Sequence, residues 1–475
     1  MPDLFLGPII GGLSPTGAYL WGRTTGEANL HAWLGKLPDL SDAQLVGKSL
    51  PVTQATGYAG VAPLQNLTPN THYHYALKLQ DTPPDPDQGP FPEFTTFPLE
   101  QQLTGFTFAF GSCFRPQSEN GGAIFRALET RRQEDDLRFI LLLGDQIYAD
   151  AFEYNGIGKI ACTLPEYRDV YTYTWSRPPL RDLLANLPAF MILDDHEVDD
   201  DWGWANSQRR IARIPFWDRI IRRLQGRPQN ERRLPLHRVQ DALQAYWEHQ
   251  AMHAPHFQIP PQLDWRDQYT LAPDDPGSLA YSFTYGAAAF FVMDARSMRV
   301  ITRSQKTILG AGQWQALENW LLAVKDQYPV KFLVTSSALL YRFWIDIARD
   351  RWSGFPNERS RLLNFLAHHG IQGVYVLAGD LHVAHALRVD LHTSTANTIR
   401  LWEFCSSPFE QSPNQLGRYT YWPLRSHPVK EQHRSFIVSQ HNFGVVRVNY
   451  SPSGKPVVRF EVYGEKGDLL AVAGD

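Results

Sequence analysis

From residue 105 onward, short uninterrupted apolar runs alternate with helical stretches, and almost every apolar run ends in polar, mostly acidic residues. Continuous apolar strands that alternate with helices predict a layered α/β sheet covered on both faces. Because ligands gather at the carboxyl ends of such strands, the polar ends mark the predicted site. The strand candidates are FTFAFGSC, RFILLLGD, AFMILDDHE, AAFFVMDA, KFLVTSS and GVYVLAGD, and the helix candidates are AIFRALETRR, GQWQALENWLLAVKDQ and RSRLLNFLAHHG.

Residues 1–98 follow a different pattern, in which Gly, Pro, Asn and Asp punctuate short strand-like segments without a useful helical period. The segment LTPNTHYHYALKL resembles the strand that carries the tyrosine corner in immunoglobulin-like or fibronectin-type sandwiches. We therefore expect a small all-β domain over residues 1–98 and a larger α/β domain over residues 105–475. The tail, NFGVVRVNYSPSGKPVVRFEVYG, predicts a closing hairpin.

Charge and cysteine usage argue against several classes of protein. The net charge is -4 with both signs along the chain, which argues against a general nucleic-acid binder or a membrane-surface protein. The three cysteines lie far apart, so no disulfide framework is evident and a reducing compartment is expected. MPDLFLGPIIGGLSPTG reads as a first strand rather than a signal peptide, and no apolar run is long enough to span a membrane. These features predict a cytoplasmic protein, or a periplasmic or secreted one if a leader has been removed.

The stretch LDDHEVDDDW places six carboxylates between Asp194 and Asp201, directly after the apolar run AFMIL. Like charges at this density repel one another and need a cation or full hydration. A solvated acidic turn is the simpler interpretation for such a run. Its place after a buried strand, with His196 enclosed, favours a metal or catalytic loop instead.

Two further strand ends share one pattern, in which Gly-Asp is followed by a second potential ligand. Asp145 and Tyr148 stand in GDQIYAD, and Asp380 and His382 stand in AGDLHVAH. The glycine lets the backbone turn tightly where the strand ends. Together with Asp195, His196 and Cys113, these residues form a set of hard and borderline ligands, which suits two metal ions bridged by a carboxylate.

The motifs GSC, GDQIYAD, DDHEV and GDLH, in this order, resemble the alkaline phosphatase D (PhoD-like) branch of the calcineurin-type metallophosphoesterases over nearly the whole chain. The resemblance implies an αββα fold, in which helices flank a layered β-sandwich core, preceded by the small immunoglobulin-like or fibronectin-like domain. It also implies a metal-dependent phosphoesterase in which a metal-bound hydroxide attacks phosphate monoesters or diesters. Relative to the general superfamily pattern, Cys113 replaces the DxH motif, Asp195 replaces the Asn of GNHE, and Asp380 replaces the first His of GHxH. Oxygen ligands in place of imidazoles favour a harder ion at one site.

The resemblance further implies the identity of the two metals and their ligands. Fe(III) would be bound by Cys113, Asp145, Tyr148 and His382. Asp145 would bridge to Ca2+, which Asp195 and Asp380 would hold, although another divalent ion could take this second position. As isolated residues, Cys113 and Tyr148 would more often be buried core residues; their position relative to Asp145 favours ligation.

Two residues are predicted to act on the substrate directly. His196 would donate a proton or hydrogen bond to the leaving oxygen, with a satisfied surface histidine as the alternative. Arg115 would bind a phosphoryl oxygen or, equally, pair with the acidic loop. Asp350 and Trp352 are further candidates, against a helix that simply begins at Pro356.

Three supporting assignments complete the prediction. His385 and Asp150 are candidates to support the ligands from behind. The basic interval 208–238 is interpreted as a solvated helix, or as an insertion that covers the site and attracts an anionic substrate, rather than as a nucleic-acid stripe.

The expected partner is a small phosphorylated substrate, with no membrane and with nucleic acid only as a diester substrate. The rival functions are a catalytically inactive Ca2+-loaded binding protein and a hydrolase of carboxylic or sulfuric esters.

Overall fold

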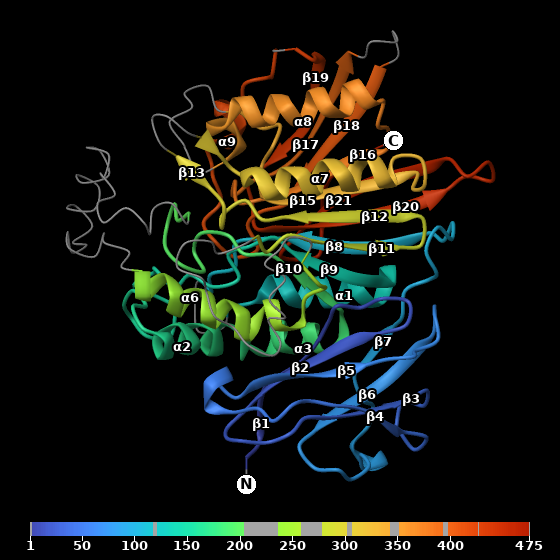
Figure 1. The fold of residues 1–475 in the computed structure, drawn as a ribbon, viewed down its shortest axis with the longest axis vertical. Helices are drawn as coiled ribbons and strands as arrows, with labels where there is room; N and C mark the ends of the chain where they lie inside the picture. The colour runs from blue at the N-terminus through green and yellow to red at the C-terminus, as the bar shows by residue number, and fades with distance from the viewer. Residues whose placement is uncertain are drawn as a thin grey trace.

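The structure is a computed structural model in which two sheets stack at the centre, with helices outside them and the N-terminal strands at one end (Figure 1). This arrangement confirms the layered α/β fold with a β-rich N-terminal part that the sequence predicts. The structure describes residues 2–116, 121–203, 236–257, 278–301, 306–342, 351–392, 398–425 and 427–474.

One central sheet has six strands in the order β10-β9-β8-β20-β21-β22. β8, β9 and β10 pair in parallel, so their carboxyl ends lie at one edge of the sheet. β20 pairs antiparallel with β8 and with β21, which confirms the predicted closing hairpin. The strands are β8 Phe106–Gly111, β9 Leu137–Leu142, β10 Ala189–Met191, β20 Asn442–Tyr450, β21 Pro456–Gly464 and β22 Leu469–Gly474.

The second central sheet has seven strands in the order β11-β12-β15-β16-β18-β17-β19. β12, β15, β16 and β18 are parallel, and the remaining strands pair antiparallel at the two sides. The strands are β11 Tyr281–Tyr285, β12 Ala288–Met293, β15 Val330–Ser337, β16 Val374–Gly379, β17 Ala384–His392, β18 Thr398–Cys405 and β19 Val429–Val438, and a short ribbon, β13 Val300–Ile301 with β14 Lys306–Thr307, stands apart.

Aromatic side chains fill the space between the two sheets. The ring of Phe108, on β8, lies 5.6 Å from Phe290 on β12 and 5.3 Å from Phe332 on β15, edge to face in both cases. Phe404 and Phe460 stack across the same interface at 4.8 Å. All five rings are inaccessible to solvent. Their burial explains why these strands read as continuous apolar runs, because each faces either the opposite sheet or a covering helix.

Helices cover the outer faces of the stacked sheets. α7 and α8 lie side by side over the seven-stranded sheet, while α1 and α3 lie beside the six-stranded sheet (Figure 1). α8 begins at Pro356, as the simpler interpretation of that segment predicts, because proline suits the first helical position. The helices are α1 Ala123–Asp135, α2 Leu164–Trp175, α3 Pro178–Asn186, α6 Leu236–His249, α7 Gly310–Val324, α8 Pro356–His369 and the single turn α9 Gly417–Thr420.

The N-terminal strands form a three-stranded sheet, β1-β2-β5, and a four-stranded sheet, β4-β3-β6-β7. The backbone N–H of Thr68 donates to the Tyr73 hydroxyl at 3.1 Å, which is the tyrosine-corner contact expected in this segment. Since every one of these strands precedes residue 98, we retain 1–98 and 105–475 as the proposed domain limits. The strands are β1 Leu4–Gly11, β2 Ala18–Thr24, β3 His31–Gly35, β4 Gln44–Lys48, β5 Ala59–Leu64, β6 His72–Lys78 and β7 Glu93–Thr95.

The N-terminal strands pack closely against helices of the larger part. The Tyr75 hydroxyl donates to the carbonyl of Ala185 in α3 at 2.7 Å, and the Trp21 indole donates to the carbonyl of Glu248 in α6 at 2.8 Å. Both aromatic side chains are fully buried, so this contact resembles a domain core rather than a loose tether. Among the described helices, none has the length and hydropathy needed to cross a membrane.

Candidate functional site

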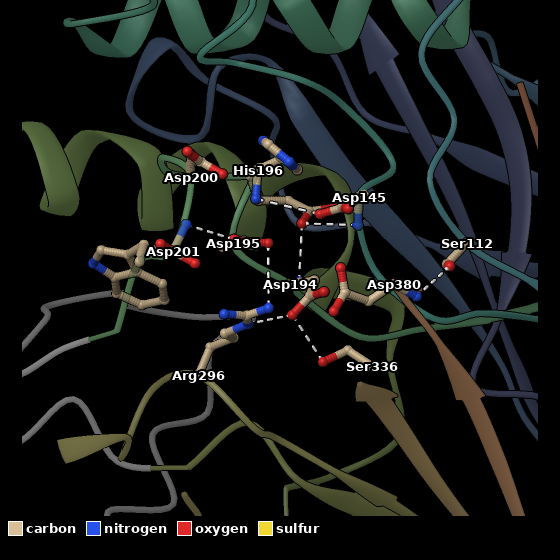
Figure 2. Close-up of polar contacts among 12 residues, drawn as sticks. Ser112, Asp145, Asp194, Asp195, His196, Asp200, Asp201, Arg296, Ser336 and Asp380 are labelled. Atoms are coloured by element: carbon tan, nitrogen blue, oxygen red, sulfur yellow. Dashed lines mark hydrogen bonds and ion pairs between the residues drawn. The ribbon is translucent and has the colours of Figure 1, made fainter. Parts of the chain in front are cut away.

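Strand ends from both central sheets meet at one place. The ends of β8, β9 and β10 bring Cys113, Asp145 and Asp195 from the six-stranded sheet, and the end of β16 brings Asp380 from the other. Figure 2 shows the carboxylates of Asp145, Asp195 and Asp380 directed toward a common centre. The structure thus brings these motifs together. Parallel strands of one sheet present three of them at the same edge, and the stacking of the second sheet adds Asp380.

Four of the predicted ligands adopt the left-handed backbone conformation that non-glycine residues rarely adopt. The φ angles are 63° at Cys113, 55° at Asp145, 64° at Asp380 and 54° at His382. Each such residue costs on the order of 1 kcal/mol or more, and the surrounding structure must supply this energy. Their concentration at these strand ends is typical of a functional site, where backbone strain aims side chains inward.

Cys113 and Tyr148 both contact the same carboxylate oxygen. The Cys113 thiol and the Tyr148 hydroxyl each lie 3.3 Å from Oδ2 of Asp145. Burial raises the pKa of the Cys113 thiol, and the nearby carboxylates raise it further; burial and Cys113 likewise raise the pKa of the Tyr148 phenol. A multivalent cation at Asp145 would reverse this balance, because it stabilises thiolate and phenolate.

His382 is linked to the same group by its backbone, through a serine. Its backbone N–H donates to the Ser407 hydroxyl at 3.2 Å, and that hydroxyl donates to the Cys113 sulfur at 3.3 Å. Burial, and then the neighbouring His196, lower the pKa of the His382 ring to about 4. The ring is therefore neutral at neutral pH, which is the state in which an imidazole binds a metal.

The carboxylates on the other side of Asp145 include one residue that the sequence analysis did not single out as a ligand. Asp194 lies with Asp145 and Asp380 in a group whose ligand atoms are within 4.8 Å of one another. Oδ1 of Asp194 accepts a hydrogen bond from Ser336 at 2.9 Å and pairs with Arg296 (Figure 2). Its Oδ2 is buried without a hydrogen-bond partner among the described residues.

Arg296 is a second residue that sequence reasoning missed. It follows β12, its side chain is fully buried, and its Nη2 lies 3.3 Å from Oδ1 of Asp195 while its Nε binds Asp194. Burial raises the pKa of Asp194 to about 7 even though Arg296 opposes the increase. The signal available in the sequence was the arginine in VMDARSMR, but its partners depend on which strand ends face each other.

Glu197 organises the backbone of two strand-end loops. Its carboxylate accepts N–H hydrogen bonds from Asp145 at 3.1 Å, from Gln146 at 2.7 Å and from Asp194 at 2.9 Å. The loop after β9 and the loop after β10 are thus fixed to each other by one side chain. Such a supporting contact sets the direction in which Asp145 presents its oxygens.

His196 lies at the entrance of the group, partly exposed. Its Nδ1 is 2.8 Å from Oδ1 of Asp150, and its ring packs 4.2 Å from the Tyr148 ring. Burial lowers the pKa of His196, but the carboxylates of Asp150, Asp145 and Asp195 outweigh burial and raise it well above its ordinary value. Asp150 therefore contacts His196 directly, in the supporting position that the sequence analysis suggested for it.

The other predicted residues lie as follows. Arg115 is half-buried two positions after Cys113, and its role toward a phosphoryl oxygen stays a prediction. Trp352 is fully buried and donates to Thr335 at 3.2 Å, which favours a place in the core. His385 is buried against Glu403 at 2.9 Å, away from the ligand contacts described above.

Two predictions concern segments outside the described residues. Asp350 lies in one of them, as does most of the basic interval 208–238. Arg238, the last arginine of that interval, is described and is not solvated. Its guanidinium is buried and donates to the carbonyl of Ala161 at 2.9 Å and to Asp199 at 3.1 Å. Arg238 therefore connects α6 to the segments that contain Ala161 and Asp199.

The donor set fits metal ions. The structure offers a thiol, a phenol and a carboxylate in mutual contact, and beside them a buried carboxylate oxygen of Asp194 that no described residue satisfies with a hydrogen bond. Burying several carboxylates together is costly unless a cation compensates them. A second acidic group joins Asp145, Asp195 and His196 within the same ligand-atom spacing. The arrangement can therefore hold metal ions on both sides of Asp145.

Two stacked sheets with these side chains at their strand ends define a metallophosphoesterase-like fold. The family model for PhoD-like phosphatase matches residues 108–455. Since this match covers well over half of the chain, the protein belongs to the PhoD-like phosphatase family, as the motifs predicted.

Individual relatives agree with this assignment. Alkaline phosphatase D of Bacillus subtilis (strain 168) is 25% identical over 367 residues, which cover 70% of this chain and 54% of that protein. The chain thus spans about half the length of this curated relative. A solved PhoD structure shares the fold with a TM-score of 0.70 at 19% identity, covering 99% of this chain and 89% of that one. A purple acid phosphatase from yellow lupin seeds (Lupinus luteus) has a TM-score of 0.59 at 13% identity, covering 100% and 74%.

Proposed function

We propose that this protein is a metal-dependent phosphoesterase that hydrolyses phosphate monoesters or diesters. The observation that carries the proposal is the contact of the Cys113 thiol and the Tyr148 hydroxyl with one oxygen of Asp145, each at 3.3 Å. A thiol and a phenol beside a buried carboxylate form an unfavourable group of potential anions unless a strongly charged cation binds them. Membership of the PhoD-like family supports hydrolysis of a phosphoric ester as the reaction.

We propose Fe(III) and Ca2+ as the metals. Cys113, Asp145, Tyr148 and His382 would hold the ferric ion, since thiolate and phenolate offset its high charge. Asp145, Asp195 and Asp380 offer the all-oxygen set that suits calcium. When bound, such ions stabilise negative charge on the phosphoryl oxygens and lower the pKa of water.

The chain's own residues would position and protonate the substrate. With Nδ1 of His196 held by Asp150 at 2.8 Å, Nε2 is the nitrogen left to donate a proton to the leaving oxygen. The Asp150 carboxylate, which raises the pKa of His196, favours the protonated ring. Arg115, two positions after Cys113, would bind a non-bridging oxygen of the phosphoryl group.

The first test is the change Asp145→Asn. We expect kcat/KM for aryl phosphates and bis-aryl phosphates to fall by more than about a hundredfold, because this carboxylate joins both halves of the site. The matched control is Asp390→Asn on β17, a half-buried carboxylate whose partners are arginines, and it should keep full activity. Undiminished activity of the Asp145→Asn protein would refute the proposed site.

The ferric assignment has its own test in visible absorption. A phenolate bound to Fe(III) gives a charge-transfer band, so freshly purified protein should be coloured and Tyr148→Phe should lose the band. Fully active protein without iron or colour would overturn this metal while leaving the hydrolase proposal intact. Turnover of carboxylic or sulfuric esters in preference to phosphoric esters would favour another reaction class, and metal binding without turnover of any ester would favour a binding protein.

A further inference from the structure

Two histidines and a glutamate form a separate cluster on the N-terminal four-stranded sheet. His72 and His74 lie two residues apart on β6, so both side chains project from the same face. Glu93 on β7 pairs directly with His74 across the ladder, and Thr95 pairs with His72. The cluster therefore combines two imidazoles from one strand with a carboxylate from its neighbour, which is a ligand set for a divalent transition metal.

The distances in this cluster are close to those of a coordination sphere. Nε2 of His72 lies 3.3 Å from Oε2 of Glu93, and Nδ1 of His74 lies 4.0 Å from the same oxygen. One ligand atom from each residue falls within 4.8 Å of the other two. In a tetrahedral site with metal–ligand bonds of about 2.0–2.1 Å, neighbouring ligand atoms are about 3.3 Å apart. Small side-chain rotations would therefore close the cluster around one ion.

Neighbouring groups orient the ligands from behind. Nδ1 of His74, the ring nitrogen for which the 4.0 Å distance to Glu93 holds, also lies 3.2 Å from the carbonyl oxygen of Phe91, so the ring must turn from this carbonyl before Nδ1 binds an ion. Nδ1 of His72 lies 3.2 Å from the Thr95 hydroxyl. Hydrogen bonds of this kind at the second ring nitrogen are the usual support of metal-binding histidines.

Glu93 is held in the same way. Arg132 of α1 binds Oε1 of Glu93 at 3.2 Å, which leaves Oε2 for the histidines. The side chain of His74 is 7% exposed and well fixed, while that of His72 is 49% exposed and gives an ion access from solvent.

We propose that His72, His74 and Glu93 form a binding site for one divalent ion of the Zn2+ type, separate from the strand-end site and independent of the proposed hydrolysis. The backbone N–H of Glu93 donates to Asn186 of α3 at 3.3 Å, and Arg132 belongs to α1. The bound ion would therefore fix β6 and β7 to each other where the N-terminal sheet contacts these two helices.

The rest of the described surface offers a matched control. Asp390, Glu431 and His433 form another exposed group with similar spacing, but this group supplies a single imidazole. His433 lies 3.1 Å from Glu431, so it has the same kind of ion-pair partner as His72. If histidine–carboxylate proximity alone bound zinc, both groups would respond alike.

The experiment measures protection of His72 from diethyl pyrocarbonate by Zn2+, mapped by mass spectrometry on the intact protein with its own metals bound. Micromolar Zn2+ should protect His72 and leave His433 reactive. His74→Gln and Glu93→Gln should each raise the zinc concentration needed to protect His72 by at least about tenfold. Equal protection of His72 in these variants, or none in the unaltered protein, would overturn the proposal.

His74 is nearly buried, so His74→Gln could lose zinc binding simply because it misfolds; a second variant distinguishes the two causes. His72→Gln changes the exposed ligand, and after removal of loosely bound metal it should retain one equivalent of zinc less than the unaltered protein. Hydrolysis of aryl phosphates should be the same in both, since His72 is remote from the strand-end residues. An unchanged zinc content of His72→Gln would contradict the site.

Discussion

Arg296 illustrates how a single residue joins the two sheets at the strand-end site. It comes from the end of β12, yet it binds Asp194 and Asp195 at the end of β10, in the other sheet. A buried ion pair adds little net stability, but removal of one partner leaves an uncompensated charge in the interior. This asymmetry makes the pair a sensitive probe of the strand-end geometry.

We predict that Arg296→Met lowers the free energy of unfolding by about 3–5 kcal/mol, because Asp194 then stays buried without its counter-ion. The double change Arg296→Met with Asp194→Asn should recover part of this loss. Denaturant unfolding of the three proteins provides the measurement. The control is Arg459→Met, because the Arg459 side chain is half exposed and Glu461 keeps its second partner, Arg447; the expected effect is below about 1 kcal/mol. Equal losses in the single and double variants would contradict the ion-pair interpretation.

For single residues, the sequence predicted those that stand within motifs and missed those whose partners depend on how the two central sheets stack. Cys113, Asp145 and Tyr148 were found because each follows a recognisable strand, and the structure brings them into contact. Arg296 and the bridging role of Glu197 were missed because the partners of Arg296, and two of the three backbone partners of Glu197, lie on other loops. Nothing in a single sequence states which loops meet. For Trp352 the sequence left both interpretations open, because a tryptophan next to a site motif looks the same whether it faces the core or the substrate.

At the scale of elements, the strand ends depend on glycines that allow close approach. Gly144, before Asp145, has a φ of 94°, and a Cβ atom there would lie 2.4 Å from Cβ of Asp194. Gly379, before Asp380, would place a Cβ atom 2.4 Å from the Ser112 hydroxyl. Both Gly-Asp motifs thus pack one strand end directly against another, which is a stricter requirement than a tight turn alone.

We predict that Gly144→Ala destabilises the protein by more than about 3 kcal/mol and displaces Asp194, with loss of phosphoesterase activity. Gly467→Ala is the matched control, since Gly467 also has a positive φ, 77°, but a Cβ atom there would have no atom of a described residue within 4 Å. That variant should cost about 1–2 kcal/mol from backbone strain alone and keep full activity. Thermal unfolding and aryl phosphate hydrolysis, measured on both, separate steric overlap from strain.

Most of the elements themselves were predictable, because buried parallel strands and amphipathic helices have distinct apolar periods. The six predicted apolar runs correspond to β8, β9, β10, β12, β15 and β16, and the three predicted helices to α1, α7 and α8. The run AFMIL is longer than the strand it contains, β10, because Ile192 and Leu193 are buried in the turn that leads to the acidic loop. The order of the strands in each sheet could not be predicted from the sequence. For example, β20 comes from the C-terminal hairpin, yet it pairs with β8.

At the scale of the whole molecule, buried histidines lie where the N-terminal strands meet the helices. His253 follows α6, and its Nε2 donates to the carbonyl of His249 at 2.8 Å. Its ring packs 6.1 Å from Trp21 and lies so close to Gly11 that a Cβ atom there would overlap it. Burial lowers the pKa of His253 to about 4.

This burial predicts that the protein loses stability in mild acid. The unfolded chain binds a proton at His253 near pH 6.5, whereas the folded protein does so only near pH 4, so unfolding is favoured as the pH falls through that window. The contribution of His253 is about 3 kcal/mol at the acid end. His253→Gln should flatten the dependence of the thermal midpoint on pH between 6.5 and 4, and parallel profiles for the two proteins would refute this assignment.

The pairing of Asp194 with Arg296 also has a consequence for the evolution of the sequence. The two residues are encoded about a hundred codons apart, at the ends of strands in different sheets. Loss of Arg296 alone leaves Asp194 buried without its cation, and loss of Asp194 alone leaves Arg296 with the more distant Asp195. Among members of this family, substitution of the arginine should therefore accompany substitution of the aspartate, so the two positions should covary.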